Sequence, residues 1–317
     1  MKLNPLILIV ATALVALGSS RADLAFESSR EPTSWTLKQD GKPILVYAFS
    51  PQVFKPYIKA LYTTSGRNVL RDSPSDHLHH HALMYGIKVN GVNFWEEVPG
   101  CGVQRVIQTS EPKLLTELGN RRAEIRQILH WVSPEDAFLP ATNSPALLVE
   151  QRTITLMMDP QTHEVAVHWR SQFEVGTKTN IVTLTGANYH GLGMRFVQDL
   201  DPLASHFSGD GSPDLSNNKQ DVSAHNWTAV SFKDNASPVT LALFGHPSNA
   251  RGNANFFSMK TPFAYLSATQ GLEKEPLVYR RGEYFELNYL VCLYPEVGTT
   301  QSLEKRYQQW EFSPRTQ

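Results

Sequence analysis

A two-residue periodicity in the middle of the chain limits its fold more than any other feature. Residues 150–158 present one set of side chains at even positions and another at odd positions, and residues 165–170 repeat the pattern after a short turn. Successive side chains of a strand point to opposite faces, so two such runs joined by a turn predict an antiparallel hairpin. Further strands are expected where β-branched and aromatic residues concentrate, at 122–132, 228–233, 238–244 and 284–293.

Helical periodicity is scarce. Leu303, Tyr307 and Trp310 have helical spacing and Thr300 can cap the start, which predicts a C-terminal helix over about 301–310. Residues 52–62 could form a short helical turn interrupted by a proline. The polar segment 202–226 is expected to be either a functional lid or a disordered excursion.

The predicted fold class is therefore all-β. We expect a large antiparallel β-sandwich with a short C-terminal helix. Residues 23–317 are expected to form this sandwich as a single domain, because no Pro- and Gly-rich linker divides them.

The first 22 residues resemble a secretory signal peptide. A positively charged N-terminus with Lys2 is followed by an apolar run from Leu6 to Leu17. Ser20 and Ala22 are small residues at positions −3 and −1 of a predicted cleavage site before Asp23. No later segment has the length and apolarity of a membrane span. We therefore expect an exported protein, periplasmic or extracellular, with no membrane partner after cleavage.

Charge and cysteine content exclude two classes of function. The 29 Lys and Arg nearly balance the 30 Asp and Glu, for a formal net charge of -1. Nucleic-acid binding requires a basic face and is not expected. Cys101 and Cys292 are the only cysteines, so a thiolate-rich zinc site is excluded and their pairing stays open.

Histidines are concentrated in one place: four of the 11 are His77, His79, His80 and His81. If this segment were a strand, His77, His79 and His81 would share one face and could bind one divalent transition metal ion. The alternatives are a metal-free polar pocket, in which imidazoles bind ligand or transfer protons, and a purely structural role.

Carboxylates could complete such a site. Asp76 is adjacent, and the Asn90-Gly91 pair favours a tight hairpin that would fold Glu96 and Glu97 back beside the histidines. Their adjacency argues against a joint role for the two glutamates, because neighbouring strand residues face opposite ways.

Polar residues elsewhere could line the same cleft. His190 and Arg195 lie around glycines that permit close backbone approach, and a later turn offers His246, Asn249 and Arg251. We expect His190, Arg195, His246 and Arg251 to form the walls of one anion- or sugar-binding cleft.

Several of these segments together resemble a family of exported bacterial proteins labelled "methane oxygenase PmoA". The resemblance rests on residues 49–57, residues 68–72, Asp76-His77-x-His79-His80-His81, Phe94-Trp95, Gly191-Leu192-Gly193-x-Arg195 and His246-Pro247-x-Asn249. The membrane methane monooxygenase subunit has several apolar spans and this chain has one apolar leader, so the resemblance is to a soluble family. It implies a role connected with polysaccharide degradation, and a large β-sandwich like that of galactose mutarotases would fit that role.

The sequence thus supports three functional hypotheses. The first is a protein that binds, and acts on, a carbohydrate or related polyol. In it the catalytic residues would be His79, His81 and His190, and the substrate-binding residues would be Trp95 (a stacking platform), Arg195, His246, Asn249 and Arg251. The second is an oxidative or hydrolytic enzyme with Cu, Zn or Fe on His77, His79 and His81. The third is a non-catalytic carbohydrate-binding module. In each the partner is a small molecule or glycan.

Overall fold

The computed structural model describes residues 26–117 and 120–312. Within these residues antiparallel strands form two nine-stranded sheets and one four-stranded sheet. The predicted signal peptide, residues 1–22, lies outside the described residues.

The first sheet contains the N-terminal strands and four later ones. Its order is β1 (Phe26–Glu31), β2 (Ser34–Gln39), β3 (Lys42–Ala48), β4 (Tyr57–Leu61), β5 (Leu83–Gly86), β14 (Gly191–Arg195), β20 (Tyr265–Thr269), β19 (Asn255–Met259) and β16 (Asp221–Ala224).

The second sheet contains the long central hairpin. Its order is β15 (Ala204–Ser208), β17 (Trp227–Phe232), β18 (Val239–Gly245), β22 (Tyr284–Tyr294), β12 (Val165–Val175), β11 (Leu148–Met158), β10 (Asn120–Val132) and β8 (Val103–Thr109), with β9 (Lys113–Glu117) beside β10. All the strands predicted from alternation lie here.

A small third sheet and a few helices complete the described structure. The sheet has the order β21 (Leu277–Arg280), β13 (Ile181–Thr185), β6 (Lys88–Val89) and β7 (Val92–Asn93). Short 3₁₀ helices occupy Pro134–Asp136, Ala141–Asn143, Asp201–Leu203 and Ser216–Asn218, and the α-helix α1 spans Thr300–Glu311.

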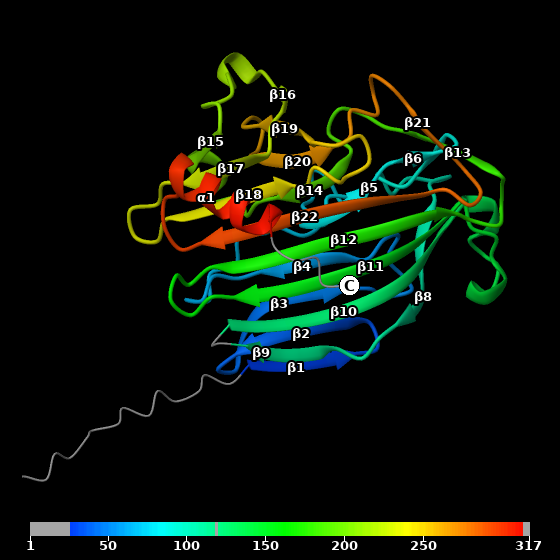
Figure 1. The fold of residues 1–317 in the computed structure, drawn as a ribbon, viewed down its shortest axis with the longest axis horizontal. Coiled ribbons are helices and arrows are strands. Elements are labelled where there is room, and N and C mark those ends of the chain that lie inside the picture. The colour runs from blue at the N-terminus through cyan, green and yellow to red at the C-terminus, as the bar shows by residue number, and fades with distance from the viewer. Residues whose placement is uncertain (1–25, 118–119, 313–317) are drawn as a thin grey trace, which may run out of the picture.

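The two large sheets pack face to face, with β10–β12 lying over β2–β4 in Figure 1. Inward side chains of both sheets form one apolar core, in which Trp35 and Leu192 of the first sheet join Ile154 and Trp169 of the second. Burying these side chains is the main favourable contribution to folding. The predicted all-β antiparallel sandwich with a short C-terminal helix is confirmed.

Helix α1 covers part of the outer face of the second sheet, against β18 and β22 (Figure 1). Its buried residues are Leu303, Tyr307 and Trp310, as predicted from their spacing. The cap is Thr299, not Thr300: the Thr299 side chain accepts a hydrogen bond from the backbone amide of Ser302.

Two other local predictions were wrong. Residues 57–61 form strand β4 and not a helical turn, since Pro56 interrupts the helical pattern and Tyr57 pairs with Ala48. The 202–226 segment is not a disordered excursion, because it contributes β15 and β16 to the two sheets.

The core contains a buried ion pair. On β11, Arg152 Nε donates to Glu150 Oε1 at 2.7 Å, and both side chains are fully buried. Glu150 also accepts hydrogen bonds from Trp131 and Ser171, and Arg152 donates to the backbone oxygen of Pro56. The pair therefore ties the second sheet to the segment that precedes β4.

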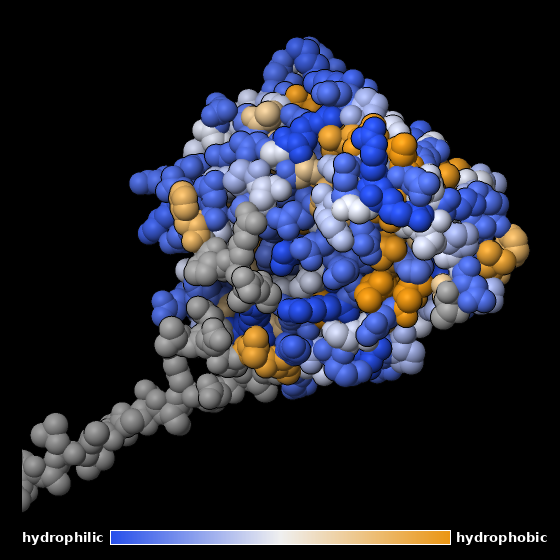
Figure 2. Space-filling model, turned by 45° about the vertical axis from the view of Figure 1, so that its right-hand side comes forward, coloured by the Kyte–Doolittle hydropathy of each residue, from blue (hydrophilic) through white to orange (hydrophobic). Residues whose placement is uncertain are grey.

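The surface shows no extended apolar face in the view of Figure 2, where apolar residues form small patches among hydrophilic ones. None of the helices in the described ranges is long and apolar enough to cross a membrane. Cys101 and Cys292 are both buried and both free, which answers the pairing question left open by the sequence.

Candidate functional site

Most of the predicted site residues lie on the outer face of the first sheet, around β5 and β14. On β14 the side chains of Leu192 and Met194 enter the core, so Gly193 and Arg195 face outward. The turns before β5 carry the four histidines to the same face. We call this region the histidine site; its members are Lys55, Asp72, Asp76, His77, His79, His80, His81, Trp95, Glu97, His190 and Arg195.

The histidine segment is not a strand. The amide of His77 donates to the oxygen of Pro74, and the amide of His80 to the oxygen of His77, both at 2.9 Å, so the chain makes successive turns. Strand β5 begins only at Leu83, after Ala82 with a φ of 45°.

The turns carry only His81 away from the other two predicted metal ligands. The ring centroids of His77 and His79 lie 5.8 Å apart, whereas His81 contacts Asp72 and Glu97. Nowhere in residues 26–117 or 120–312 do three His, Cys, Asp or Glu side chains converge as metal ligands would. The strand geometry from which a His77, His79 and His81 metal triad was predicted is therefore not present.

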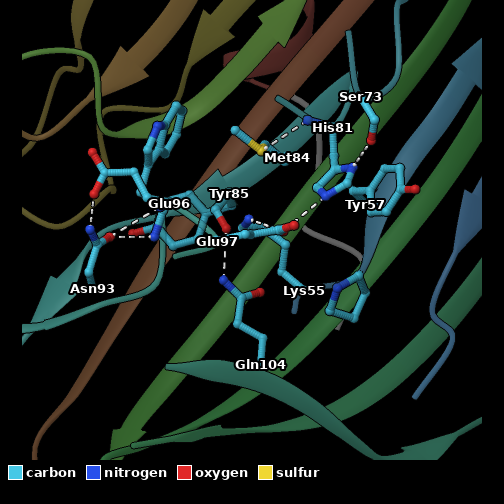
Figure 3. Close-up of polar contacts among 12 residues, drawn as sticks. Lys55, Tyr57, Ser73, His81, Met84, Tyr85, Asn93, Glu96, Glu97 and Gln104 are labelled. Carbon is cyan, nitrogen blue, oxygen red and sulfur yellow. Dashed lines mark hydrogen bonds and ion pairs between the residues drawn. The ribbon is translucent and has the colours of Figure 1, made fainter. Parts of the chain in front are cut away.

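His81 lies between two carboxylates, as Figure 3 shows for its contact with Glu97. Its Nδ1 is 2.9 Å from Asp72 Oδ1, and its Nε2 is 2.9 Å from Glu97 Oε1. Tyr57 stacks on the imidazole with ring centroids 4.3 Å apart and hydrogen-bonds to Asp72. Lys55 Nζ contacts the same Glu97 oxygen at 2.7 Å.

The charges in this network are mutually reinforcing. Burial alone would lower the pKa of His81, but its bonds to Asp72 and Glu97 outweigh burial and raise that pKa. Burial likewise favours the neutral carboxyl forms, yet contact with His81 lowers the pKa of both Asp72 and Glu97. Both ring nitrogens of His81 are occupied, so it positions other groups.

The predicted hairpin delivers Glu97 to this network. Asn90 and Gly91 both have positive φ, 49° and 81°, and join β6 to β7. Asn93 Oδ1 accepts a hydrogen bond from the backbone amide of Glu96. The Asn93 side-chain amide donates a hydrogen bond to the Glu96 carboxylate (Figure 3). Glu96 and Glu97 therefore have different partners, Asn93 for the first and His81 and Lys55 for the second.

A second part of the site contains buried polar atoms that have no hydrogen-bond partner within the described protein. They are His80 Nδ1, Trp95 Nε1, both ring nitrogens of His190, and Nε and Nη1 of Arg195. The four side chains are contiguous: Trp95 stacks on His190 at 5.0 Å and meets His80 edge-on at 6.4 Å. Phe263 bridges His80 to the Arg195 guanidinium.

These side chains are deeply buried: Trp95 is 0% exposed, His190 1% and Arg195 2%. Burial lowers the pKa of both His80 and His190 to about 3, so both imidazoles are neutral near pH 7. Because Trp95 is fully buried beneath His190, it offers no ring face to solvent, contrary to its predicted role as a stacking platform.

His79 lies at the partly exposed edge of the site. Its pKa is lowered by burial and by the nearby Lys55. Asp76, at the same edge, contacts Arg195 Nη2 at 3.2 Å. The edge thus combines a neutral imidazole with a carboxylate.

Gly193 allows the two aromatic groups to approach the backbone. A Cβ atom at this position would lie 1.9 Å from the Tyr265 hydroxyl and 2.9 Å from the Trp95 ring. The close approach expected from the glycines of this segment is therefore present, and it is a condition for the packing of Trp95.

Three predicted site residues lie elsewhere, so the single cleft expected from sequence is not formed. His246 lies on the outer face of the second sheet, 5.3 Å from the ring of Trp310. The side-chain oxygen of Asn249 accepts a hydrogen bond from the backbone amide of Asn288, which is on β22 of the same sheet. Arg251 donates to the backbone oxygens of Gln270, Gly271 and Pro276, which fixes loops.

Sequence reasoning placed Glu97 near the histidines but missed two other members of the His81 network, Asp72 and Lys55. Asp72 and Lys55 lie 9 and 26 positions before His81 in the chain, and no spacing rule links them to it. Both fall in segments that carried the family resemblance, and that was the only available signal.

These features define the class of protein: an all-β sandwich with a buried, histidine-rich polar site on one sheet. The chain belongs to the family of unknown function DUF6807, whose model matches residues 34–308. The label "methane oxygenase PmoA" is not part of that description. No curated protein matches the sequence.

Solved structures with a similar fold include carbohydrate-active enzymes. An alpha-galactosidase from Geobacillus stearothermophilus is 12% identical with a TM-score of 0.49, covering 85% of this chain and 41% of its own. One from Lactobacillus brevis is 6% identical with a TM-score of 0.47, covering 92% and 42%. A galactose mutarotase related enzyme from Lactobacillus acidophilus is 8% identical with a TM-score of 0.30, covering 87% and 100%.

This chain spans about two fifths of the length of the two galactosidases. Likeness at this level concerns architecture and does not extend to activity.

Proposed function

We propose that the protein is exported and binds a sugar or related polyol at the histidine site, where it assists proton transfer. The observation that carries the proposal is the group of buried, unpartnered polar atoms on His80, Trp95, His190 and Arg195. Each such atom destabilises a folded protein by about 1–3 kcal/mol unless something bonds it. Their concentration beside one another favours a ligand-binding role.

The chemistry of these atoms fits hydroxyl groups. Trp95 Nε1 and the Arg195 nitrogens only donate hydrogen bonds, whereas a neutral imidazole such as His190 both donates and accepts. A hydroxyl does both as well, so several hydroxyls on one small ring can match this mixture. Arg195 could also hold a ligand carboxylate.

Separate roles follow for the edge residues. His79 is neutral near pH 7 and partly exposed, so it is the proposed acceptor of a proton from a ligand hydroxyl. His81 is a positioning residue that fixes Glu97 and Lys55. The metal-dependent alternative is not proposed, because the residues that the structure describes bring together no three His, Cys, Asp or Glu side chains as a ligand set.

The test is ligand binding by wild type and by His190→Phe, which retains stacking on Trp95 and removes both nitrogens. Glucose, galactose, glucuronate and myo-inositol are screened by thermal shift, and the best is measured by calorimetry. We expect at least one to bind wild type and to lose about tenfold or more affinity in the variant.

The matched control is His130→Phe, which removes a buried unpartnered nitrogen on the second sheet. It should bind like wild type. No binding by wild type to any of the four, or equal loss in both variants, would contradict the proposal. Export is tested separately, by sequencing the mature N-terminus, which should begin at Asp23.

A further inference from the structure

The outer face of the second sheet contains a cavity of about 600 Å³, beside the C-terminal end of α1. This volume is within the range of small-ligand sites. The cavity lies on the opposite side of the sandwich from the histidine site, because most of its lining comes from outward side chains of β10, β11, β12 and β22. We call it the arginine groove.

Strand register arranges polar side chains in rows across the groove. Arg126 pairs with Thr153, Thr153 with Arg170, and Arg170 with Asn288, so all four project from the same face of adjacent strands. Neighbouring strands are about 4.8 Å apart, which makes the row about 14 Å long. The row is elongated and suits a short chain-like ligand.

The accessible charge of the groove is positive. The side chains of Arg122, Arg126 and Arg170 are 31%, 56% and 30% exposed, whereas those of Glu124 and Glu286 are 8% and 20% exposed. The carboxylates are therefore largely covered by the arginines that neutralise them. The guanidinium groups are therefore the charged groups most accessible to a ligand in the groove.

These arginines also retain donors for a ligand. Arg126 contacts Glu124 through Nε, and Arg170 contacts Glu286 through Nη2, and each guanidinium has five N–H donors. Arg122 Nε is buried without a partner in the described protein. Such planar donors bind carboxylates in a bidentate manner.

The next row of the groove is uncharged apart from Glu286. Gln151 pairs with Gln172 and Gln172 with Glu286, so two exposed amides stand beside the arginine row. Amides donate and accept, which suits hydroxyl groups. The aromatic side chain at the groove, Trp310, is only 8% exposed and gives bases no stacking face, so a nucleic acid is disfavoured.

From this combination we propose that the arginine groove binds an acidic oligosaccharide, a short chain of uronate sugars whose carboxylates contact Arg126 and Arg170. This site is separate from the histidine site. It does not depend on the function proposed there.

The test is calorimetry with trigalacturonate and with its methyl ester, which has the same rings without the charges. The acid should bind at least about tenfold more tightly than the ester, and its affinity should fall as salt is added. The double variant Arg126→Gln/Arg170→Gln should lose about tenfold affinity. Lys42→Gln/Lys274→Gln removes the same charge from exposed positions elsewhere and should bind normally.

Several results would overturn the proposal. These are no binding of the acid by wild type, equal binding of acid and ester, and tighter binding of a single-stranded RNA trimer. Loss of trigalacturonate binding in His190→Phe, with the groove variant unaffected, would place that ligand at the histidine site. Acid–ester discrimination and salt dependence are measured on wild type, so the test survives a poorly folded variant.

Discussion

Replacement of His81 by Phe should destabilise the protein by about 3 kcal/mol near pH 6. Phe retains the stacking on Tyr57 but removes the cation between Asp72 and Glu97. Two charge-assisted hydrogen bonds are lost, each contributing about 1.5–3 kcal/mol. The lower end applies, since Asp72 and Glu97 are 19% and 15% exposed and Glu97 keeps Lys55.

The effect should depend on pH with a definite sign. The folded pKa of His81 is raised, so its contribution is complete below the unfolded value of about 6.5 and is lost as pH rises through the folded pKa. The folded pKa values of Asp72 and Glu97 are lowered, so their contribution disappears only in acid. The difference between wild type and His81→Phe should therefore be larger at pH 6 than at pH 9.

Urea denaturation of both proteins at pH 6 and pH 9 measures this difference. The reasoning would be refuted by a loss below about 1 kcal/mol at pH 6, or by a loss that grows with pH. Either result would mean that His81 is neutral in the folded protein.

Three further predictions concern packing. Arg152→Met should leave the buried Glu150 carboxylate without its cation and cost about 3–5 kcal/mol in urea denaturation; a loss near zero would contradict the buried pair. Gly193→Ala should displace Tyr265 and lower stability by about 1–3 kcal/mol, and an unchanged melting temperature would show that the contact is not tight. Thr299→Ala should cost about 1 kcal/mol by calorimetry, whereas Thr300→Ala should not.

The sandwich could be predicted because strand periodicity is a local property. The 150–170 hairpin, the neighbouring strands and the buried face of α1 all follow from residues a few positions apart. The same periodicity gave a wrong local structure at residues 76–81. Alternate residues share a face only in an extended chain, and this segment forms turns that end at Ala82, which has a left-handed backbone conformation.

The candidate site could be predicted only in part. His79, His190 and Arg195 were recognised by residue type, but which of two sheets a segment joins is decided by long-range pairing. That pairing places His246 on the second sheet and brings Asp72 to His81. Neither relation leaves a periodic signal in the sequence.

We propose that a ligand is the hydrogen-bond partner of the two His190 ring nitrogens, which are buried and have no partner within the described residues. The free energies of unfolding of ligand-free wild type, His190→Phe and His190→Leu test it most directly. We predict that at least one of the two variants has a free energy of unfolding about 1 kcal/mol or more above that of wild type. The reason is that each substitution removes the unsatisfied polar atoms of His190. If both variants were less stable than wild type by that amount, His190 would be satisfied within the protein and the account would be contradicted.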